Sequence, residues 1–146
     1  MKTQILMMLS WTLFSGPLFA SPSSAHDIVE TSGIDGGVVV LVGLDDPDRL
    51  AGMQIDDSYV VHGLDTDPVK VASARERIAA AGKYGKISVA QFDGKTLPYV
   101  DNLVNLIVTD NAGNSLQDEI HRVLAPRGIS MVGGKAKIKA LPADID

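Results

Sequence analysis

An acidic residue, Asp65, directly follows an apolar and β-branched run over residues 59–64 and comes about twenty residues after Gly43. In doubly wound α/β folds, this spacing separates the glycine turn after the first strand from the carboxylate that binds ribose. A carboxylate there can accept hydrogen bonds from both ribose hydroxyls. The alternative is a turn or capping aspartate beside Asp67. The pattern favours a ribose site, with Gly43 and Asp65 as candidate cofactor-binding residues.

Two further acids follow expected strands. Asp93 follows the strand expected over residues 86–92, where it could accept a hydrogen bond from an exocyclic amine of adenine. An Asp-Gly turn explains Asp93 equally well. Asp110 follows the strand expected over residues 103–109, close to where a substrate would lie, and an ordinary loop residue is the alternative. Asp93 and Asp110 complete the set of candidate cofactor-binding residues.

The other polar residues predict no catalytic or metal site. The chain has no cysteine, which excludes disulfides, thiol nucleophiles and Cys-type zinc sites. An acidic run after Gly43 lacks the ligand spacing and the glycine of an EF-hand loop, which favours a solvated loop over a calcium site: Asp45, Asp46 and Asp48. The histidines have no Ser or Cys that the pattern places beside them, which favours structural roles: His26, His62 and His121.

These candidates need a frame that gathers the ends of several strands. Apolar runs predict strands over residues 38–42, 59–64, 86–92, 103–109 and 129–132, and helical spacing predicts helices over residues 46–55, 68–81 and 115–124. Asp67 is expected to cap the second helix, and Ser115 with Asp118 to form a capping box on the third. The alternation predicts an α/β fold: a three-layer, doubly wound, mostly parallel sheet of about five strands.

The start of the chain differs from the rest. Lys2 precedes an apolar run over residues 5–14, which a Gly-Pro pair ends, and small residues follow. This order is typical of a secretory signal peptide over residues 1–25, with cleavage after Ala20 or Ala25. A membrane anchor is the alternative, although the run is short for a span. We predict an exported protein, periplasmic or secreted, with one domain over residues 26–146 and no stable membrane span after cleavage.

The charge of the chain argues against two classes of partner. The net charge is −5, which gives no electrostatic attraction to nucleic acid or to anionic membranes. Three lysines alternate near the end of the chain, as in an exposed sheet edge or tail that resists aggregation: Lys135, Lys137 and Lys139.

Several of these motifs together resemble class I S-adenosylmethionine-dependent methyltransferases. They are the strand with Gly43, residues 60–68, Asp93, and residues 119–128 (EIHRVLAPRG). The resemblance implies that Asp65 binds the ribose of S-adenosylmethionine and that Asp93 contacts its adenine. Residues 119–128 correspond to the family's E-x-x-R-V-L-x-P-G-G signature. This correspondence makes a nicotinamide-dependent oxidoreductase a less suitable interpretation. More narrowly, residues 62–104 are similar to the leading domain of large exported bacterial proteins that continue into β-propeller repeats of the pyrroloquinoline-quinone type.

The sequence also departs from the family pattern. Of the family's glycine motif only Gly43 is present, so that Leu44 and Asp45 are expected to bring side chains into the cofactor space, and Pro47 removes an N–H donor. Arg127 stands where the family usually has glycine. The last strands of the complete family sheet are expected to be absent, because little sequence follows Gly134.

Two functions follow from these observations. The first is a methyltransferase that binds S-adenosylmethionine and aligns a methyl acceptor with it, with no residue identified as a general base. The second is a non-catalytic exported module that keeps the fold and contributes to a larger protein or assembly. The sequence identifies no methyl acceptor.

Overall fold

The computed structural model describes residues 25–143, so the predicted signal peptide lies outside the described residues except for Ala25. The helices are α1 (Ala25–Ser32), α2 (Pro47–Gly52), α3 (Pro68–Ala80) and α4 (Asn114–Val123). The strands are β1 (Gly37–Val42), β2 (Tyr59–Asp65), β3 (Ile87–Gln91), β4 (Val104–Thr109), β5 (Leu124–Val132) and β6 (Lys135–Ile138). No helix within residues 25–143 is long and apolar enough to cross a membrane.

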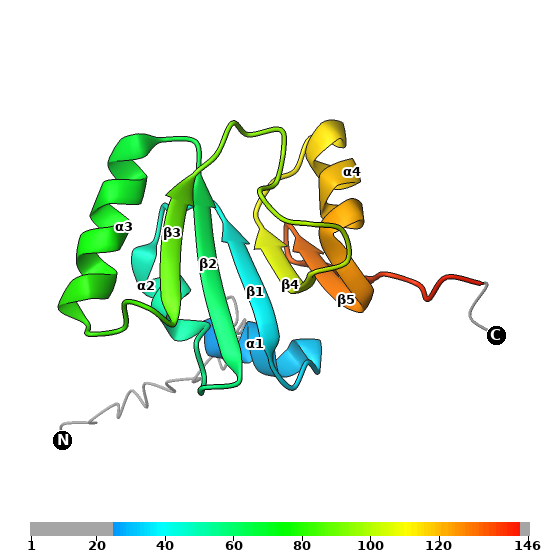
Figure 1. Cartoon of the computed structure of the whole chain (residues 1–146), viewed down its shortest axis with the longest axis horizontal. Coiled ribbons are helices and arrows are strands. Elements are labelled where there is room, and N and C mark those ends of the chain that lie inside the picture. The colour runs from blue at the N-terminus through cyan, green and yellow to red at the C-terminus, as the bar shows by residue number, and fades with distance from the viewer. Residues whose placement is uncertain (1–24, 144–146) are drawn as a thin grey trace, which may run out of the picture.

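The strands form a single six-stranded sheet in the order β3-β2-β1-β4-β5-β6 (Figure 1). Every neighbouring pair from β3 to β5 is parallel, and β6 runs antiparallel to β5. The chain moves outward from β1 to β3 and then crosses to β4 on the other side of β1, which is the doubly wound arrangement. The predicted fold class is therefore confirmed.

The sixth strand was not predicted. Gly133 and Gly134 have φ angles of 55° and 77°, and they turn the chain back so that Lys135 pairs with Val132. All four residues of β6 are exposed, which confirms the predicted exposed sheet edge for Lys135 and Lys137, whereas Lys139 follows the strand and is partly buried. The expected strand over residues 129–132 is also longer than predicted, because Leu124 already pairs with Val104 before a register shift.

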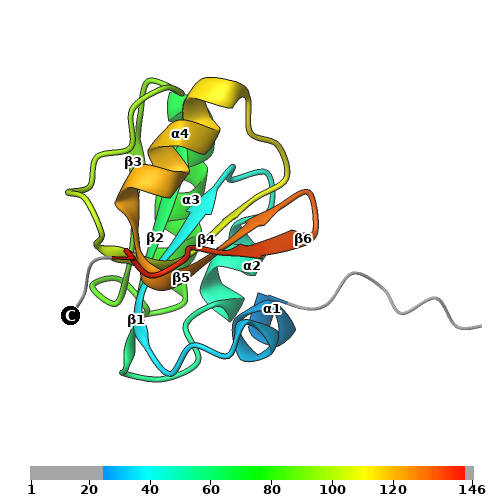
Figure 2. The same ribbon diagram turned by 90° about the vertical axis from the view of Figure 1, so that its right-hand side faces the viewer.

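Helices cover both faces of the sheet. On one face, α1, α2 and α3 pack against the larger apolar cluster, which includes Val39, Leu41, Val61 and Leu106 (Figures 1 and 2). On the other face, α4 packs against a second cluster that includes Val40 and Ile107. Adjacent strand residues therefore enter different cores, as expected for strands that are buried on both sides.

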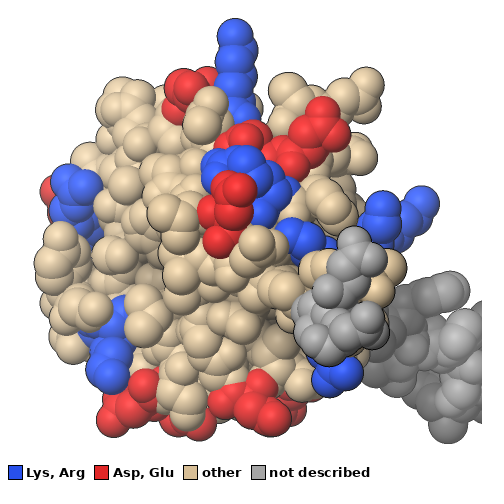
Figure 3. All heavy atoms as spheres, turned by 45° about the vertical axis from the view of Figure 1, so that its right-hand side comes forward, with Lys and Arg blue, Asp and Glu red and all other residues tan. Residues whose placement is uncertain are grey.

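The α4 face is covered less completely than the other. Among the described residues no helix connects β3 to β4, and an irregular segment over residues 92–103 takes its place. Leu97 from this segment is buried against the α4 cluster, but Val60 on β2 stays 47% exposed. Figure 3 shows a broad area without charged side chains on this side of the molecule.

The helix starts show which local predictions were correct. Asp67 caps α3 as predicted, since its carboxylate accepts a hydrogen bond from the Val69 N–H at 2.8 Å. The capping box predicted at Ser115 and Asp118 is wrong. The N-cap of α4 is Gly113, which has no side chain that could accept a hydrogen bond, so Ser115 already lies inside the helix.

Candidate functional site

The carboxyl ends of β1, β2 and β4 surround a shallow hollow of about 290 Å³. Three of the four predicted site residues line it: Gly43 after β1, Asp65 at the end of β2 and Asp110 after β4. The strand order places β1 between β2 and β4, so these ends are adjacent although they are far apart in sequence. The complete lining is Val42, Gly43, Asp45, Asp65, Thr66, Phe92, Gly94, Thr109, Asp110, Asn111 and Leu116.

Asp65 is held in place by the backbone of two loops. One carboxylate oxygen accepts a hydrogen bond from the Leu44 N–H at 2.8 Å, and the other accepts one from the Asp67 N–H at 2.9 Å. Burial alone would raise the pKa of Asp65, but these N–H groups and the nearby Lys70 ammonium together hold it below the ordinary value of 3.8. Asp65 is therefore ionised at neutral pH, and each oxygen keeps a lone pair for a further donor.

The loop after β1 has a different geometry from the one predicted. Gly43 has a φ of 102°, and no atom lies within 4 Å of the position of a Cβ there. The expectation that the Leu44 side chain enters the cofactor space is wrong. It is 2% exposed and packs into the larger core, where a Cβ on Gly63 would lie 2.8 Å from its Cδ2. The absence of a side chain on Gly63 thus makes room for Leu44.

The acidic residues after Leu44 have partners within the protein. Asp45 lines the hollow and forms an ion pair with Lys70, and Asp48 forms one with Arg77. Asp46 caps α2 by accepting a hydrogen bond from the Asp48 N–H at 3.0 Å. The side chains of Asp45 and Asp48 are 79% and 70% exposed, which agrees with the predicted solvated loop, and basic side chains hold them as well.

Asp93 differs from the other predicted site residues. Phe92 and Gly94 on either side of it line the hollow, but one Asp93 oxygen accepts hydrogen bonds from the Lys95 and Thr96 N–H groups at 2.8 and 2.7 Å. These two donors hold the pKa of Asp93 below its usual value. The contacts are those of the turn aspartate that was the alternative to an adenine contact.

Asp110 also has a protein partner. Its carboxylate accepts two hydrogen bonds from one terminal nitrogen of Arg49, at 3.1 and 3.3 Å. This contact joins the end of β4 to α2 across the open edge of the sheet. The Asp110 side chain stays 79% exposed, so the ion pair leaves it accessible to a ligand.

The charge of the hollow restricts its ligands. Three carboxylates line it, from Asp45, Asp65 and Asp110, and no Lys or Arg does. The walls are apolar where Val42, Phe92 and Leu116 contribute. Such a lining disfavours phosphate groups, which nucleotide sites bind with N–H donors and positive charge. It suits a neutral or cationic ligand that carries hydroxyl groups.

The role of Glu119 and Arg122 was not predicted from the sequence. The guanidinium donates hydrogen bonds to both Glu119 oxygens, to the Asp101 carboxylate and to the backbone carbonyls of Leu97 and Tyr99. Glu119 in turn accepts a hydrogen bond from the Leu97 N–H at 2.8 Å. The two side chains thus fasten the irregular 92–103 segment to α4. The E-x-x-R spacing, which places both residues on one side of a helix, was the available signal.

His62 has a partner on the same segment. Its Nδ1 contacts the Tyr99 hydroxyl, and the two rings meet edge to face with centroids 5.6 Å apart. Burial lowers the pKa of His62, so the imidazole is neutral at physiological pH. The predicted structural role of His62 agrees with these contacts.

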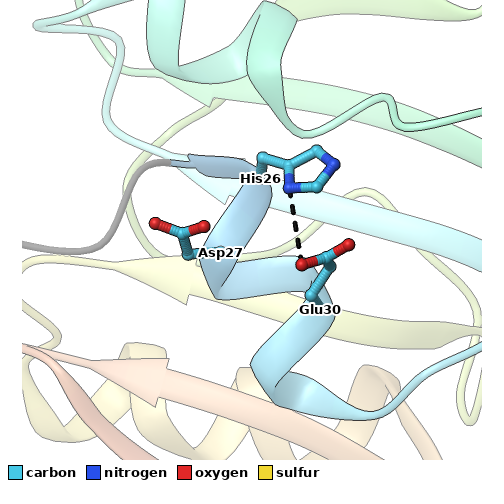
Figure 4. Close-up of side chains that lie close together, drawn as sticks. All are labelled: His26, Asp27 and Glu30. Atoms are coloured by element: carbon cyan, nitrogen blue, oxygen red, sulfur yellow. Dashed lines mark ion pairs between the residues drawn. The ribbon is translucent and has the colours of Figure 1, made fainter.

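One group of metal-ligating side chains lies within the described part of the chain, although the sequence predicted no metal site. His26, Asp27 and Glu30 lie on α1 with their ligand atoms within 4.8 Å of one another. Figure 4 shows His26 facing Glu30, and the His26 Nδ1 lies 3.6 Å from the Glu30 Oε2. Both side chains are about half exposed or more, and we assign no metal to them.

The fold is that of known methyltransferases. No protein-family model and no curated protein matches the sequence. Among solved structures, a putative S-adenosylmethionine-dependent methyltransferase from Methanococcus maripaludis is 24% identical, with a TM-score of 0.65 over 74% of this chain and 52% of the other. A methyltransferase from Aquifex aeolicus is 18% identical, with a TM-score of 0.68 over 76% of this chain and 63% of the other. A geranyl diphosphate methyltransferase solved with S-adenosylmethionine is 13% identical, with a TM-score of 0.66 over 74% and 46%.

These comparisons establish the class I methyltransferase fold. The chain spans 46% to 63% of the length of the three solved structures above.

Proposed function

We propose that this chain is an S-adenosylmethionine-dependent methyltransferase-like domain that holds the cofactor mainly by its nucleoside half. The observation that carries the proposal is the position of Asp65. It is an ionised carboxylate at the end of β2, and it lines a hollow with Gly43 and no basic residue. S-adenosylmethionine offers ribose hydroxyls and a sulfonium cation, which match hydroxyl-accepting and negatively charged walls.

The residues fit the nucleoside half of the cofactor better than the amino-acid half. Asp65 would hold the ribose, and the apolar walls at Phe92 and Leu116 would contact the adenine. Near the amino-acid half, Asp45 adds a carboxylate where the family pattern has glycine, and Pro47 offers no N–H. When bound, the cofactor would supply an electrophilic methyl group. The contribution of the protein would be orientation and exclusion of water, and we assign no catalytic residue.

Calorimetric titration tests this proposal directly. The mature domain should bind S-adenosylmethionine, S-adenosylhomocysteine and adenosine, and Asp65→Asn should weaken all three about tenfold, as expected for losing a charged acceptor on ribose. Asp57→Asn is the matched control, because Asp57 lies before the amino end of β2, at the other end of the strand from Asp65, and is 92% exposed. Absence of heat with all three ligands at millimolar concentration would exclude the proposal.

A non-catalytic module is the second candidate. The observation that favours it is that Asp65, Asp93 and Asp110 all have partners within the protein. The hollow is also small, since ligand pockets usually measure about 300–1,000 Å³. Such a domain would keep the fold and act as a scaffold. The same titration distinguishes the two candidates, because a scaffold would bind none of the three nucleosides.

We further propose that the protein is exported, with cleavage after Ala20 or Ala25, and that it functions either alone or as part of a larger exported protein of the propeller type. The support is the order of charged, apolar and small residues at the start of the chain and the similarity of residues 62–104. N-terminal sequencing of the protein from cell fractions tests the export. A cytoplasmic protein that begins at Met1 would contradict it.

A further inference from the structure

A groove between α4 and the β5–β6 hairpin lies apart from the nucleoside hollow. Its volume is about 630 Å³, which is within the range of ligand pockets. Figure 2 looks onto this side of the molecule, with the hairpin beside the lower part of α4. The lining comprises Gln117, Ile120, His121, Leu124, Ser130, Val132, Lys135, Ala136, Lys137, Ile138, Lys139 and Ala140. None of these residues lines the hollow at Asp65.

The register of the hairpin sets the direction of two lysines. Lys135 pairs with Val132 and Lys137 pairs with Ser130, and directly paired residues in an antiparallel ladder share one face of the sheet. Val132 packs against the α4 cluster. Lys135 and Lys137 therefore project from the face that carries α4.

The groove combines apolar walls with unpaired positive charge. Ile120 and Leu124 are buried along the α4 side, at 4% and 3% exposure. Within residues 25–143, neither Lys135 nor Lys137 has an ion-pair partner, whereas Asp45 and Asp110 at the nucleoside hollow each have one. No Asp or Glu lines the groove, although the whole chain has a net charge of −5.

The third lysine of the hairpin has a different role. The Lys139 ammonium donates hydrogen bonds to the Leu124 carbonyl at 2.7 Å and to the Asn102 amide oxygen at 2.8 Å. These contacts fix the end of the hairpin against the first residue of β5 and the 92–103 segment. The other two ammonium groups are left to meet a ligand.

We propose that this groove binds a small anionic amphiphile, with its apolar body along Ile120, Leu124 and Val132 and its anionic head at Lys135 and Lys137. The complementarity of charge favours an anion over a cation or a neutral ligand. The concave shape between a helix and a hairpin favours a single small molecule over the flat surface of a membrane. The site does not depend on cofactor binding at Asp65.

Calorimetry with decanoate provides the test, because decanoate has one carboxylate and one apolar chain. Saturable binding of one decanoate per chain is expected, and Lys135→Gln/Lys137→Gln should weaken it about tenfold through the loss of two ion pairs. Lys83→Gln/Lys95→Gln removes the same charge away from the groove and should bind decanoate like the original protein. Surface substitutions of this kind leave the fold intact.

Three further probes separate this groove from other sources of binding. Decyltrimethylammonium has the same chain with the opposite charge, and equal binding of it would overturn the proposal. Inorganic phosphate has charge without a chain and should bind far more weakly. Vesicles of phosphatidylglycerol test a membrane surface, and binding to them without binding of decanoate would also overturn the proposal. The proposal would likewise fail if the two double variants lost decanoate affinity equally.

Discussion

The loop after β1 and the late segment over residues 119–128, which ends α4 and begins β5, match the methyltransferase pattern to very different degrees. The early loop keeps only Gly43 of its glycine motif, whereas residues 119–128 match six of the seven residues that the signature specifies, including Glu119 and Arg122. The structure shows that the late residues contact the protein itself. Glu119 and Arg122 hold residues 97–101 through hydrogen bonds within the protein.

The early loop differs in that its side chains depart from the family pattern. Leu44 packs into the larger core, and Asp45 pairs with Lys70. The comparison indicates that the matching residues of the late segment serve the fold. A close match to the late signature is therefore evidence for the fold, and the early loop is where evidence about the cofactor must be sought.

The largest expected effect tests whether the early loop has become structural. Leu44→Ala should reduce the free energy of unfolding by about 3 kcal/mol, since it removes a fully buried leucine and leaves a cavity over Gly63. Denaturant unfolding measures the change. Leu103→Ala, at a side chain that is 42% exposed, should cost far less. Equal losses in the two variants would show that the loop is not anchored by Leu44.

The stability of the protein should be sensitive to a single methyl group added at Gly128 in the late segment. A Cβ on Gly128 would lie 2.7 Å from the Ala125 carbonyl and 3.0 Å from the Val104 carbonyl, and both are backbone atoms that cannot move aside easily. Gly128→Ala should therefore cost about 2 kcal/mol of stability. Gly113→Ala is the control, because no atom lies within 4 Å of a Cβ there. A stable Gly128→Ala protein would contradict the close packing of this segment.

The sequence predicted those parts of the fold that depend on apolar patterning. The strands from β1 to β5 and helix α3 follow from continuous apolar runs and from the Asp67 cap. Strand β6 was missed because its residues are all exposed, so no pattern of burial marks it. The capping box failed because Gly113 and Ser115 both suit a helix start, and only the position of the preceding loop decides between them.

The site was predicted less completely than the fold. The positions of Gly43, Asp65 and Asp110 at one edge follow from the topology alone. The direction of the Leu44 side chain does not, because it depends on Gly63 in a neighbouring strand. The partners of Asp93 and Arg122 depend on the path of residues 92–103, which have no periodic pattern that would define it.

A pH dependence connects Asp65 to both loops that it holds. The pKa of Asp65 in the folded protein lies below the ordinary 3.8. The stabilisation that the ionised carboxylate gives to the folded state is therefore fully present above pH 3.8, and it is lost as the pH falls through the lower folded pKa. Asp65→Asn should cost about 1.5 kcal/mol at pH 7, since an amide accepts fewer hydrogen bonds than a carboxylate. The difference from the original protein should shrink below about pH 4. A difference that is constant from pH 7 to pH 3 would contradict this role.

The smallest expected effect is a gain in stability at the one late position that departs from the family pattern. Arg127 has a φ of 66°, in the left-handed region that costs a residue with a Cβ about 1–2 kcal/mol and costs glycine almost nothing. Arg127→Gly should therefore raise the free energy of unfolding by about 1 kcal/mol, after allowing for the greater freedom of glycine in the unfolded chain. Arg127→Ala keeps the Cβ and should give no gain, although it removes the same side-chain charge. Equal stability of the two variants would show that the glycine of the family signature is not required for backbone conformation at this position. The late segment could then no longer be said to serve the fold alone, and the contrast with the early loop would fail.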